Sequence, residues 1–359
     1  MKKTRTHFNI LVINPGSTST KLALYRNHSA VIFKTISYSS ARLRKFPSII
    51  SQLPMRLEGV EKFLKAQGKI SLDAIAARGG VLRPLAGGVY KVNDKMCGEL
   101  SKALHGEHGS NLGALIAHKL SQSKSCPAYI ADPVVVDEMK DVARISGMPG
   151  IERKSLFHAL NQKSVARLAL KRLGKEYEKC NVIVAHLGGG ISVGAHKKGQ
   201  VVDVNNALDG DGPFSPERTG GLPAGQLAAL IYKEGLDEAA LKRKLSGQGG
   251  VVAYCGTNNM ATIEVKRKQG NKKSQLLTRA LAYQVSQEIA KHGATLQGKV
   301  DRIVITGGLA KDKEIVSKIK RQVSFLASIS VIPGEREMPA LAENILAVLK
   351  KEKRAKVYL

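Results

Sequence analysis

The chain of 359 residues has no tryptophan, few other aromatic residues, four cysteines and no apolar run of membrane-spanning length. The missing run argues against a helical membrane span. Aromatic residues make up 4%, so stacking surfaces for single-stranded nucleic acid are poorly supplied. The cysteines form no CxxC pair and have no metal-ligand spacing, which favours a reduced, cytoplasmic protein; they are Cys97, Cys126, Cys180 and Cys255.

Acidic residues are also scarce, with 29 Asp and Glu against 57 Lys and Arg and a net charge of +28. Such a balance favours polyanions, which include nucleic acid, acidic membrane surfaces and phosphorylated metabolites. The basic residues are spread along the whole chain and form no long basic tail. We therefore interpret the charge as a solvated basic surface and expect no specific nucleic-acid partner and no membrane partner. A nucleic-acid binder stays open as an alternative.

Three common catalytic sites are not indicated by the sequence. The chain has no GxxxxGK[ST] phosphate loop and no HExxH zinc motif, and the letters GxSxG occur only in GISVG, residues 190–194, where a strand follows instead of the helix that a nucleophile elbow requires. These features argue against a P-loop nucleotidase, a Ser-His-Asp hydrolase of the elbow type and a zincin metalloprotease.

The elements that are present predict an α/β protein of two domains, in keeping with the length of the chain. Residues 8–38 alternate strand, turn, strand, turn and strand, and both turns are too short for a helix, so neighbouring strands should be antiparallel. We interpret the first apolar run as a strand, not as a signal peptide. The same pattern returns after Lys179, which predicts two halves of one architecture. Amphipathic helices are expected around residues 55–67, 111–122 and 273–294.

The first meander carries the turn PGSTSTK. Its small residues, Gly16 to Thr20, offer backbone N–H groups and hydroxyls that could surround a phosphate. Lys21 adds a positive charge, and Asn14 at the strand end could hold a phosphate oxygen or a metal-bound water. An ordinary hydroxyl-rich hairpin turn is the alternative.

The second meander carries HLGGGISVG, residues 186–194. Three consecutive glycines between strands indicate a close ligand approach, although a flexible turn is the alternative. A Rossmann turn is rejected, because the glycine spacing differs and a strand follows where a helix is required. Later, TGGLAKD (residues 306–312) places two glycines between a strand and a helix, where an anion or a ribose could bind.

Three further sets of residues are candidates for phosphoryl chemistry. The loop DGDGPFSPERTGGLP, residues 209–223, carries Arg218, which could stabilise charge on a transferring phosphoryl group. His158 stands alone on an expected helix, where a structural role is the alternative. Acids that could hold Mg²⁺ are Asp132, Asp203, Glu335 and Glu337.

With these residues in view, the chain resembles the acetate and butyrate kinases of the acetokinase family, and the resemblance runs end to end. The loop VNNALDGDGPFSPER is similar to that of butyrate kinases and not to that of acetate kinases. The other matching segments are INPGSTSTK, GEHGSNLGALIAHKL, ADPVVVDEMKDVARISG, PGIERKSLFHALNQK, HLGGGISVGAH and ITGGLAKD.

The resemblance implies two RNase H-like, actin-like ATPase domains hinged around a central nucleotide cleft. It places the first domain at residues 1–152 plus 337–359 and the second, nucleotide-binding domain at residues 153–336. It implies a reversible transfer of a phosphoryl group from ATP to butanoate with Mg²⁺, in a cytoplasmic homo-oligomer. The alternatives are a kinase for acetate, propanoate or isobutanoate, and a non-enzymatic ATP-dependent protein on the same scaffold.

The resemblance also implies roles for individual residues. Those expected to act on the transferring phosphoryl group are Arg218, His158, Asp132 and Arg78, with Arg83 as an alternative to Arg78. Those expected to bind ATP phosphates or the nucleoside are Asn14, Ser17, Ser19, Lys21, His186, Gly188, Gly189, Gly190, Gly307 and Gly308. Asn14 and Glu337 are expected at the metal, with Glu335 as an alternative to Glu337.

Overall fold

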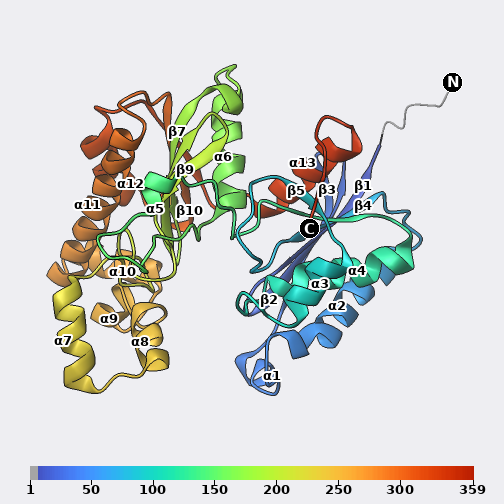
Figure 1. The fold of residues 1–359 in the computed structure, drawn as a ribbon, viewed down its shortest axis with the longest axis horizontal. Helices are drawn as coiled ribbons and strands as arrows, with labels where there is room; N and C mark the ends of the chain where they lie inside the picture. Colours follow the sequence, from blue (N-terminus) through green and yellow to red (C-terminus); the bar gives the residue numbers. More distant parts are fainter. Residues whose placement is uncertain (1–6) are drawn as a thin grey trace. The chain divides into compact units, whose positions relative to one another are not determined.

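The computed structural model describes residues 7–359, so the basic start of the chain, residues 1–6, lies outside the described residues. The protein is an α/β protein with two compact units (Figure 1). Unit 1 runs to Val136 and includes Arg336–Leu359, and unit 2 is Asp137–Glu335. The sequence placed these boundaries at 152/153 and 336/337.

Unit 1 contains a sheet of seven strands in the order β12-β5-β6-β4-β1-β2-β3. Strands β1, β2 and β3 form the antiparallel meander that the sequence predicted, and β1, β4 and β6 are parallel. The strands are β1 (Asn9–Pro15), β2 (Ser19–Arg26), β3 (Ser29–Ser37), β4 (Ala74–Arg78), β5 (Val89–Lys91), β6 (Ala128–Ala131) and β12 (Lys356–Val357).

Two long helices of unit 1 pack on the parallel strands. Helices α4 and α13 both contact β1, β4 and β6, so the middle of these strands is buried on both faces and consists of apolar residues throughout. In Figure 1, α13 lies on one side of the strands and α3 and α4 on the other. The helices are α1 (Ser40–Leu43), α2 (Leu53–Lys65), α3 (Asp94–Ser101), α4 (Asn111–Lys124) and α13 (Glu337–Leu349), with a 3₁₀ turn η1 (Ile50–Gln52).

Unit 2 repeats the order of five of the seven strands of unit 1, β6-β4-β1-β2-β3. Its five-stranded sheet has the order β11-β10-β7-β8-β9, in which β7, β8 and β9 form an antiparallel meander and β7, β10 and β11 are parallel. The repeat of architecture predicted from the sequence is therefore confirmed. The strands are β7 (Asn181–Leu187), β8 (Ile191–Lys197), β9 (Gln200–Val204), β10 (Arg302–Gly307) and β11 (Ile329–Pro333).

Helices of unit 2 cover two different faces of its sheet. Along β7, Ile183, Ala185 and Leu187 pack in the same core as α11, whereas Val182 and Val184 pack with α6. The period of two along the strand therefore decides which helix each side chain meets. The helices are α5 (Asp141–Arg144), α6 (Ala159–Lys171), α7 (Ala224–Glu234), α8 (Glu238–Leu245), α9 (Val251–Cys255), α10 (Met260–Lys268), α11 (Lys272–Thr295) and α12 (Lys313–Val323), with 3₁₀ turns η2 (Tyr177–Lys179) and η3 (Gly308–Lys311).

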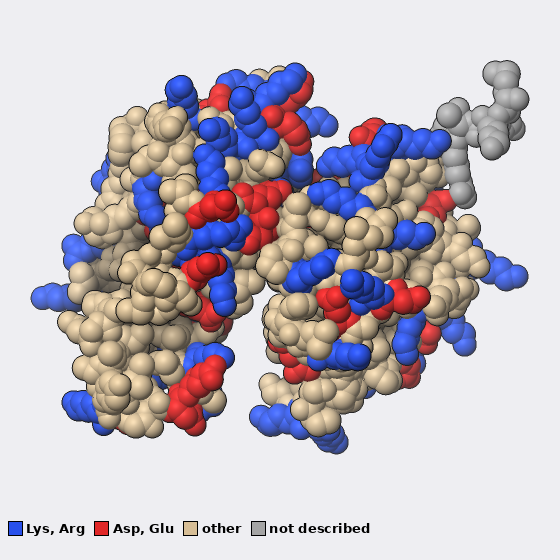
Figure 2. Space-filling model, viewed as in Figure 1, with Lys and Arg blue, Asp and Glu red and all other residues tan. Residues whose placement is uncertain are grey.

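The excess of basic residues is distributed over the surface. Figure 2 shows Lys and Arg side chains scattered over the visible face of each unit, with Asp and Glu among them. This face therefore carries the basic surface expected from the sequence and not one concentrated patch. Within residues 7–359, no helix has the length and the apolar character that crossing a bilayer requires.

Candidate active site

The first cluster of predicted residues lies where three parallel strands of unit 1 end. Because β1, β4 and β6 are neighbours and parallel, their carboxyl ends meet at one edge of the sheet. Asn14 is near the end of β1, Arg78 ends β4, and Asp132 follows β6. Ligands of open α/β sheets bind at this edge. The fold thus brings together residues that are far apart in the sequence.

Asn14, Arg78 and Glu337 form a linked group. The Nδ2 atom of Asn14 donates to Oε2 of Glu337 over 2.8 Å, and Nη2 of Arg78 lies 3.1 Å from Oε1 of the same carboxylate. Glu337 is in this position because it begins α13, which returns to pack on β1 and β4. The alternative Glu335 is the last residue of unit 2.

The structure also separates the two candidate arginines. Arg78 contacts Glu337, whereas the guanidinium of Arg83 lies 4.9 Å from the centre of the Tyr358 ring and donates to the backbone oxygen of Leu359. Arg83 is thus engaged with the end of the chain.

The surroundings of Asn14 fit a metal ion that is shared with a phosphate. Its Oδ1 atom is buried beside the carboxylate of Glu337 and has no hydrogen-bond partner among residues 7–359. Oxygen atoms of this kind suit Mg²⁺, which commonly uses one or two protein ligands together with substrate phosphates. No group of three or more His, Cys, Asp and Glu side chains in residues 7–359 is arranged to hold a metal ion.

The turn between β1 and β2 is a hairpin, and its shape is set by a buried arginine. The amide of Gly16 donates to the carbonyl oxygen of Ser19 over 2.8 Å, which closes the turn. From α2, Arg56 donates to the carbonyl oxygens of Gly16, Ser17 and Ser19 over 2.8–3.1 Å. Burial lowers the pKa of Arg56 below its ordinary value. The carbonyls therefore face Arg56, and the Ser17 side chain is exposed.

Lys21 and Asp132 flank this turn and the strand ends. Lys21 is paired with Asn14 across β1 and β2, so the two side chains share a face of the sheet. Asp132 is buried and has φ of 38°, a left-handed conformation that Asp tolerates better than most residues. Its Oδ1 accepts from the amide of Gly88 over 2.8 Å, which fixes the carboxylate at the end of β6.

The second cluster lies at the corresponding strand ends of unit 2. His186 and Thr306 are paired across β7 and β10, and the glycine turn 188–190 joins β7 to β8. Gly307 has φ of 91°, and a Cβ there would lie 2.6 Å from the carbonyl carbon of Leu187. Glycine is therefore required where the end of β10 approaches β7. At Gly308, by contrast, a Cβ would face open space.

Arg218 lies directly against the glycine turn. A Cβ on Gly190 would lie 2.6 Å from Cζ of Arg218 and closer still to its Nη1, which donates to the carbonyl oxygen of Ala207. The loop that carries Arg218 is anchored to the same turn, because the Ser215 hydroxyl donates to the carbonyl oxygen of Gly189 over 2.6 Å. Burial lowers the pKa of Arg218 below its ordinary value, and the carboxylates of Glu217 and Asp209 act in the opposite direction.

His158 and His186 are stacked rings. Their centroids are 3.8 Å apart and their planes differ by 11°. His158 is the residue just before α6, not within it as the sequence indicated, and its Nδ1 lies 2.9 Å from the hydroxyl oxygen of Ser192. The Nδ1 of His186 lies 2.8 Å from Nδ2 of Asn161. The fold thus places both histidines beside one another on the α6 face of the sheet.

Some site residues were missed and one candidate was misplaced. Arg56 was not singled out, although a charged residue at the same helical face as Val60 and Phe63 is a usable signal. Asn161 and Ser192 were also missed, because isolated polar residues in a helix and a strand carry no motif. Asp203, a candidate metal ligand, is paired with Arg153 over 2.9 Å and has a structural role in unit 2.

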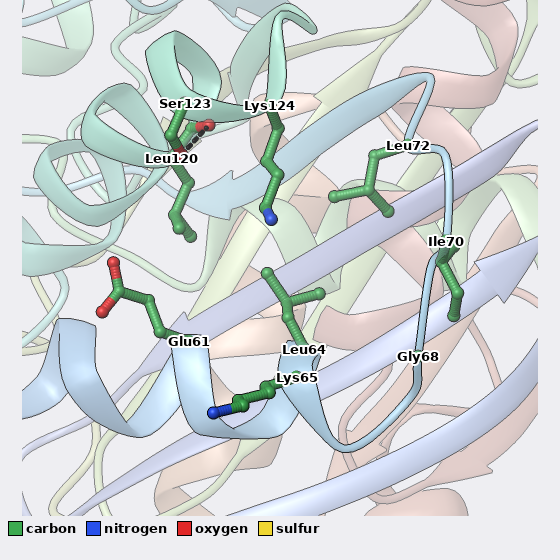
Figure 3. Close-up of a pocket in the computed structure, with 9 residues that line it drawn as sticks. All are labelled: Glu61, Leu64, Lys65, Gly68, Ile70, Leu72, Leu120, Ser123 and Lys124. Atoms are coloured by element: carbon green, nitrogen blue, oxygen red, sulfur yellow. Dashed lines mark hydrogen bonds between the residues drawn. The ribbon is translucent and has the colours of Figure 1, made fainter.

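A hollow elsewhere in unit 1 includes none of the predicted residues. It has a volume of about 420 Å³ and lies between α2, the loop that follows it and the end of α4 (Figure 3). Leu64, Leu72 and Leu120 form its apolar wall, and Lys65 and Lys124 stand at its edge.

The sequence comparisons identify relatives along nearly the whole chain. The model of the acetokinase family matches residues 148–338. The chain is 47% identical over 353 residues to butyrate kinase 2 of Clostridium acetobutylicum, which covers 98% of this chain and 99% of that protein. It is 50% identical over 354 residues to a protein of Coprothermobacter proteolyticus named probable butyrate kinase, with the same two coverages.

The structural comparisons agree at the level of the fold. The acetate kinase of Porphyromonas gingivalis superposes with a TM-score of 0.76 at 18% identity, over 95% of this chain and 100% of that chain. A propionate kinase of Francisella tularensis gives a TM-score of 0.73 at 21% identity, over 94% and 98%. These likenesses confirm the α/β fold that the sequence predicted.

Proposed function

Since the chain belongs to the acetokinase family, we propose that it transfers the γ-phosphoryl group of ATP reversibly to the carboxylate of butanoate. The observation that supports this most directly is the pair of clusters at the strand ends, where cations and hydrogen-bond donors stand beside glycine turns. These groups suit phosphates, and the relatives that share about half of the sequence are named butyrate kinases.

The reaction sets the demands on the protein. A carboxylate oxygen of butanoate attacks the γ-phosphorus of ATP, the bond from that phosphorus to the β–γ bridging oxygen breaks, and ADP leaves with the electron pair. The carboxylate is already an anion, so no general base is needed. The obstacle is the repulsion between two anions, which positioning and charge neutralisation must overcome.

The residues of unit 2 would neutralise the phosphoryl group. Arg218 is a half-buried cation against the glycine turn, and it could contact a phosphoryl oxygen there. His158 and His186 would donate hydrogen bonds from their stacked rings. The turn 188–190 and Gly307 would let the backbone approach the phosphates of the nucleotide.

The residues of unit 1 would hold the metal and phosphate oxygens. Asn14 and Glu337 would hold Mg²⁺, which supplies positive charge to phosphate oxygens when it is bound. Arg78 fixes the Glu337 carboxylate, and Asp132 has its place fixed by Gly88. Lys21 shares a sheet face with Asn14, and the turn at Ser17 and Ser19 offers hydroxyls for the phosphates.

The choice of butanoate follows from the relatives and is tested with a panel of acids. We expect ADP release from ATP with Mg²⁺ to be fastest with butanoate among acetate, propanoate, butanoate, isobutanoate and pentanoate. Acyl phosphate is trapped in parallel as the hydroxamate, and samples with EDTA in place of Mg²⁺ should lose nearly all turnover.

The possible outcomes of this panel separate the alternatives. A clear preference for acetate or isobutanoate would move the proposal to another short-chain acid. ATP binding without acid-dependent ADP release would support a non-enzymatic protein. Full turnover in EDTA would contradict the metal assignment.

We also propose that the chain forms a cytoplasmic homo-oligomer. Helices α7 and α8 contain no buried residue, and the Tyr232 side chain is 87% exposed on the apolar α7. A second copy of the chain would cover these side chains. The four unpaired cysteines fit a reducing compartment, which supports the cytoplasmic location.

The oligomeric state is tested by sedimentation. The wild type should be at least a dimer, and Tyr232→Asp should weaken the association. A monomeric wild type at micromolar concentration would contradict the proposed homo-oligomer.

A further inference from the structure

A chain of hydrogen bonds runs through the interior of unit 2 and ends at His158. The Tyr177 hydroxyl lies 2.7 Å from Nδ1 of His196, and Nε2 of His196 lies 2.9 Å from Oε1 of Gln162. Nε2 of Gln162 lies 2.8 Å from the Ser192 hydroxyl oxygen, which in turn lies 2.9 Å from Nδ1 of His158. The first four of these residues are buried, so water does not compete for their hydrogen bonds.

One backbone carbonyl determines the direction of the first part of this chain. Nε2 of Gln162 lies 3.0 Å from the carbonyl oxygen of Ser192, which can only accept, so the amide NH₂ group must face Ser192. The amide oxygen then faces His196, whose Nε2 must carry hydrogen. Burial, together with the positive charges of Lys163 and Arg167, lowers the pKa of His196 well below its usual range. His196 is therefore neutral, and its Nδ1 accepts from Tyr177.

The same reasoning extends to His158. The Ser192 oxygen accepts from Gln162 and, over 3.5 Å, from the amide of His158. Both of its lone pairs are then used, and its own hydrogen points to Nδ1 of His158. The opposite tautomer of His158 would leave a buried hydroxyl hydrogen without an acceptor, which is energetically unfavourable. Nδ1 of His158 is thus an acceptor, and the hydrogen of the neutral ring is on Nε2.

A second, independent series of hydrogen bonds fixes the tautomer of His186 in the same way. The Thr306 hydroxyl donates to the carbonyl oxygen of Gly334 over 3.1 Å, so its oxygen accepts from Nδ2 of Asn161 over 3.4 Å. The amide NH₂ group of Asn161 is thereby oriented, and it also lies 2.8 Å from Nδ1 of His186. Nδ1 of His186 accepts as well. Two backbone carbonyls therefore set the same tautomer in both stacked rings.

We propose that Gln162 and Asn161 are positioning residues that hold His158 and His186 as Nε2–H tautomers, so that the rings present fixed N–H donors to phosphate oxygens. The tautomers follow from the hydrogen-bond geometry alone, whereas their use on phosphate rests on the proposed function. Donors that already have the right orientation need not reorganise when charge develops in the transition state. They therefore lower the activation barrier more than mobile donors would. Two neighbouring residues of α6, Asn161 and Gln162, thus fix the tautomers of the two stacked histidines.

One substitution should disturb this series of hydrogen bonds without removing a polar group. Gly194 lies on β8 between Ser192 and His196, and a Cβ there would lie 2.7 Å from Oε1 of Gln162. Gly194→Ala should push the amide of Gln162 away from both partners. Gln162→Met removes the hydrogen bonds at nearly constant volume, and Ser192→Thr keeps the hydroxyl. Ser164→Ala on the same helix is the matched control, because its buried hydroxyl has no hydrogen-bond partner.

The test reads the tautomers by NMR of the full-length protein labelled with ¹⁵N at histidine, at a pH where free histidine is neutral. His158→Asn and His186→Asn assign the signals. In the wild type and in the Ser192→Thr and Ser164→Ala variants, we expect both rings to be Nε2–H tautomers. In Gln162→Met and Gly194→Ala, we expect the ring of His158 to populate more than one tautomer. These two variants should also lose about tenfold in kcat with a smaller change in KM for ATP, in the range measured for residues that orient a functional histidine.

Two results would overturn the proposal. One is an Nδ1–H tautomer or an imidazolium at His158 in the wild type. The other is an unchanged tautomer in both Gln162→Met and Gly194→Ala when these variants unfold at the wild-type temperature. The tautomers are read without turnover. A protein that shows them but phosphorylates no acid would therefore refute the proposed function and not the ordering of the rings.

Discussion

Replacing Arg218 by alanine is expected to lower kcat by about 10²–10³-fold, the effect of removing one group that stabilises transition-state charge. The expectation rests on the position of the guanidinium against the glycine turn and on its burial. Charge on the phosphoryl oxygens is spread over the transition state, and a planar cation can contact two of them. The affinity for ATP should change much less, because other groups hold the nucleotide.

Steady-state turnover and calorimetric ATP binding check this prediction together. Arg218→Lys should recover only part of the loss, because a point charge cannot reproduce two parallel hydrogen bonds. Arg172→Ala is the charge-matched control; this arginine is exposed at the end of α6 and should leave turnover within about twofold. Near-wild-type kcat in Arg218→Ala would remove Arg218 from the proposed mechanism.

Gly190→Ala is expected to reduce kcat nearly as far, by about 10²-fold, although it removes no functional group. The added Cβ would lie 2.6 Å from Cζ of Arg218 and overlap its Nη1. The severe clash is with the end of a flexible side chain, whereas the carbonyl oxygen of Ala207, 3.1 Å from the added Cβ, has to give way only slightly. The protein should therefore fold, and the guanidinium should move. Turnover then falls because the cation is misplaced.

Gly98→Ala in α3 is the control for this prediction. An added Cβ there would meet no atom within 4 Å, and the residue lies outside the proposed site, so kcat should stay near that of the wild type. The double variant Gly190→Ala with Arg218→Ala should be no slower than Arg218→Ala alone, because both changes act through the same cation. Additive losses, or a loss confined to ATP affinity, would assign Gly190 to nucleotide binding instead. Thermal unfolding checks that each variant is folded.

Much of the fold could be predicted from local patterns. The short turns in residues 8–38 and after Lys179 leave no room for crossover helices, so both meanders had to be antiparallel. The helix expected at residues 273–294 is α11 (Lys272–Thr295), because its apolar period is long and regular. The boundaries of the two units were less accessible, because the chain crosses between them in irregular segments with no strong pattern.

The candidate site was predicted less evenly. Glycine turns and strand-end residues could be found because their chemistry is visible in a few letters, as in the turn after Asn14. Arg78 and Arg83 could not be separated, since one ends a strand and the other follows it closely, and the sequence does not show which one meets a carboxylate. The partner of Arg78 is Glu337, which belongs to a helix near the other end of the chain. The buried Arg56 behind the first turn was missed for a similar reason.

The sequence by itself determined the two α/β halves, the phosphate-type turns and the class of chemistry, because periodicity, turn composition and motifs act over a few residues. Only the tertiary structure decided which residues meet. Asn14 contacts Glu337 across 323 positions, His158 stacks on His186, and Arg218 fills the space left by Gly190. Such contacts depend on which strands are neighbours and where helices return to the sheet. That order is a property of the packed core, and no short stretch of sequence contains it.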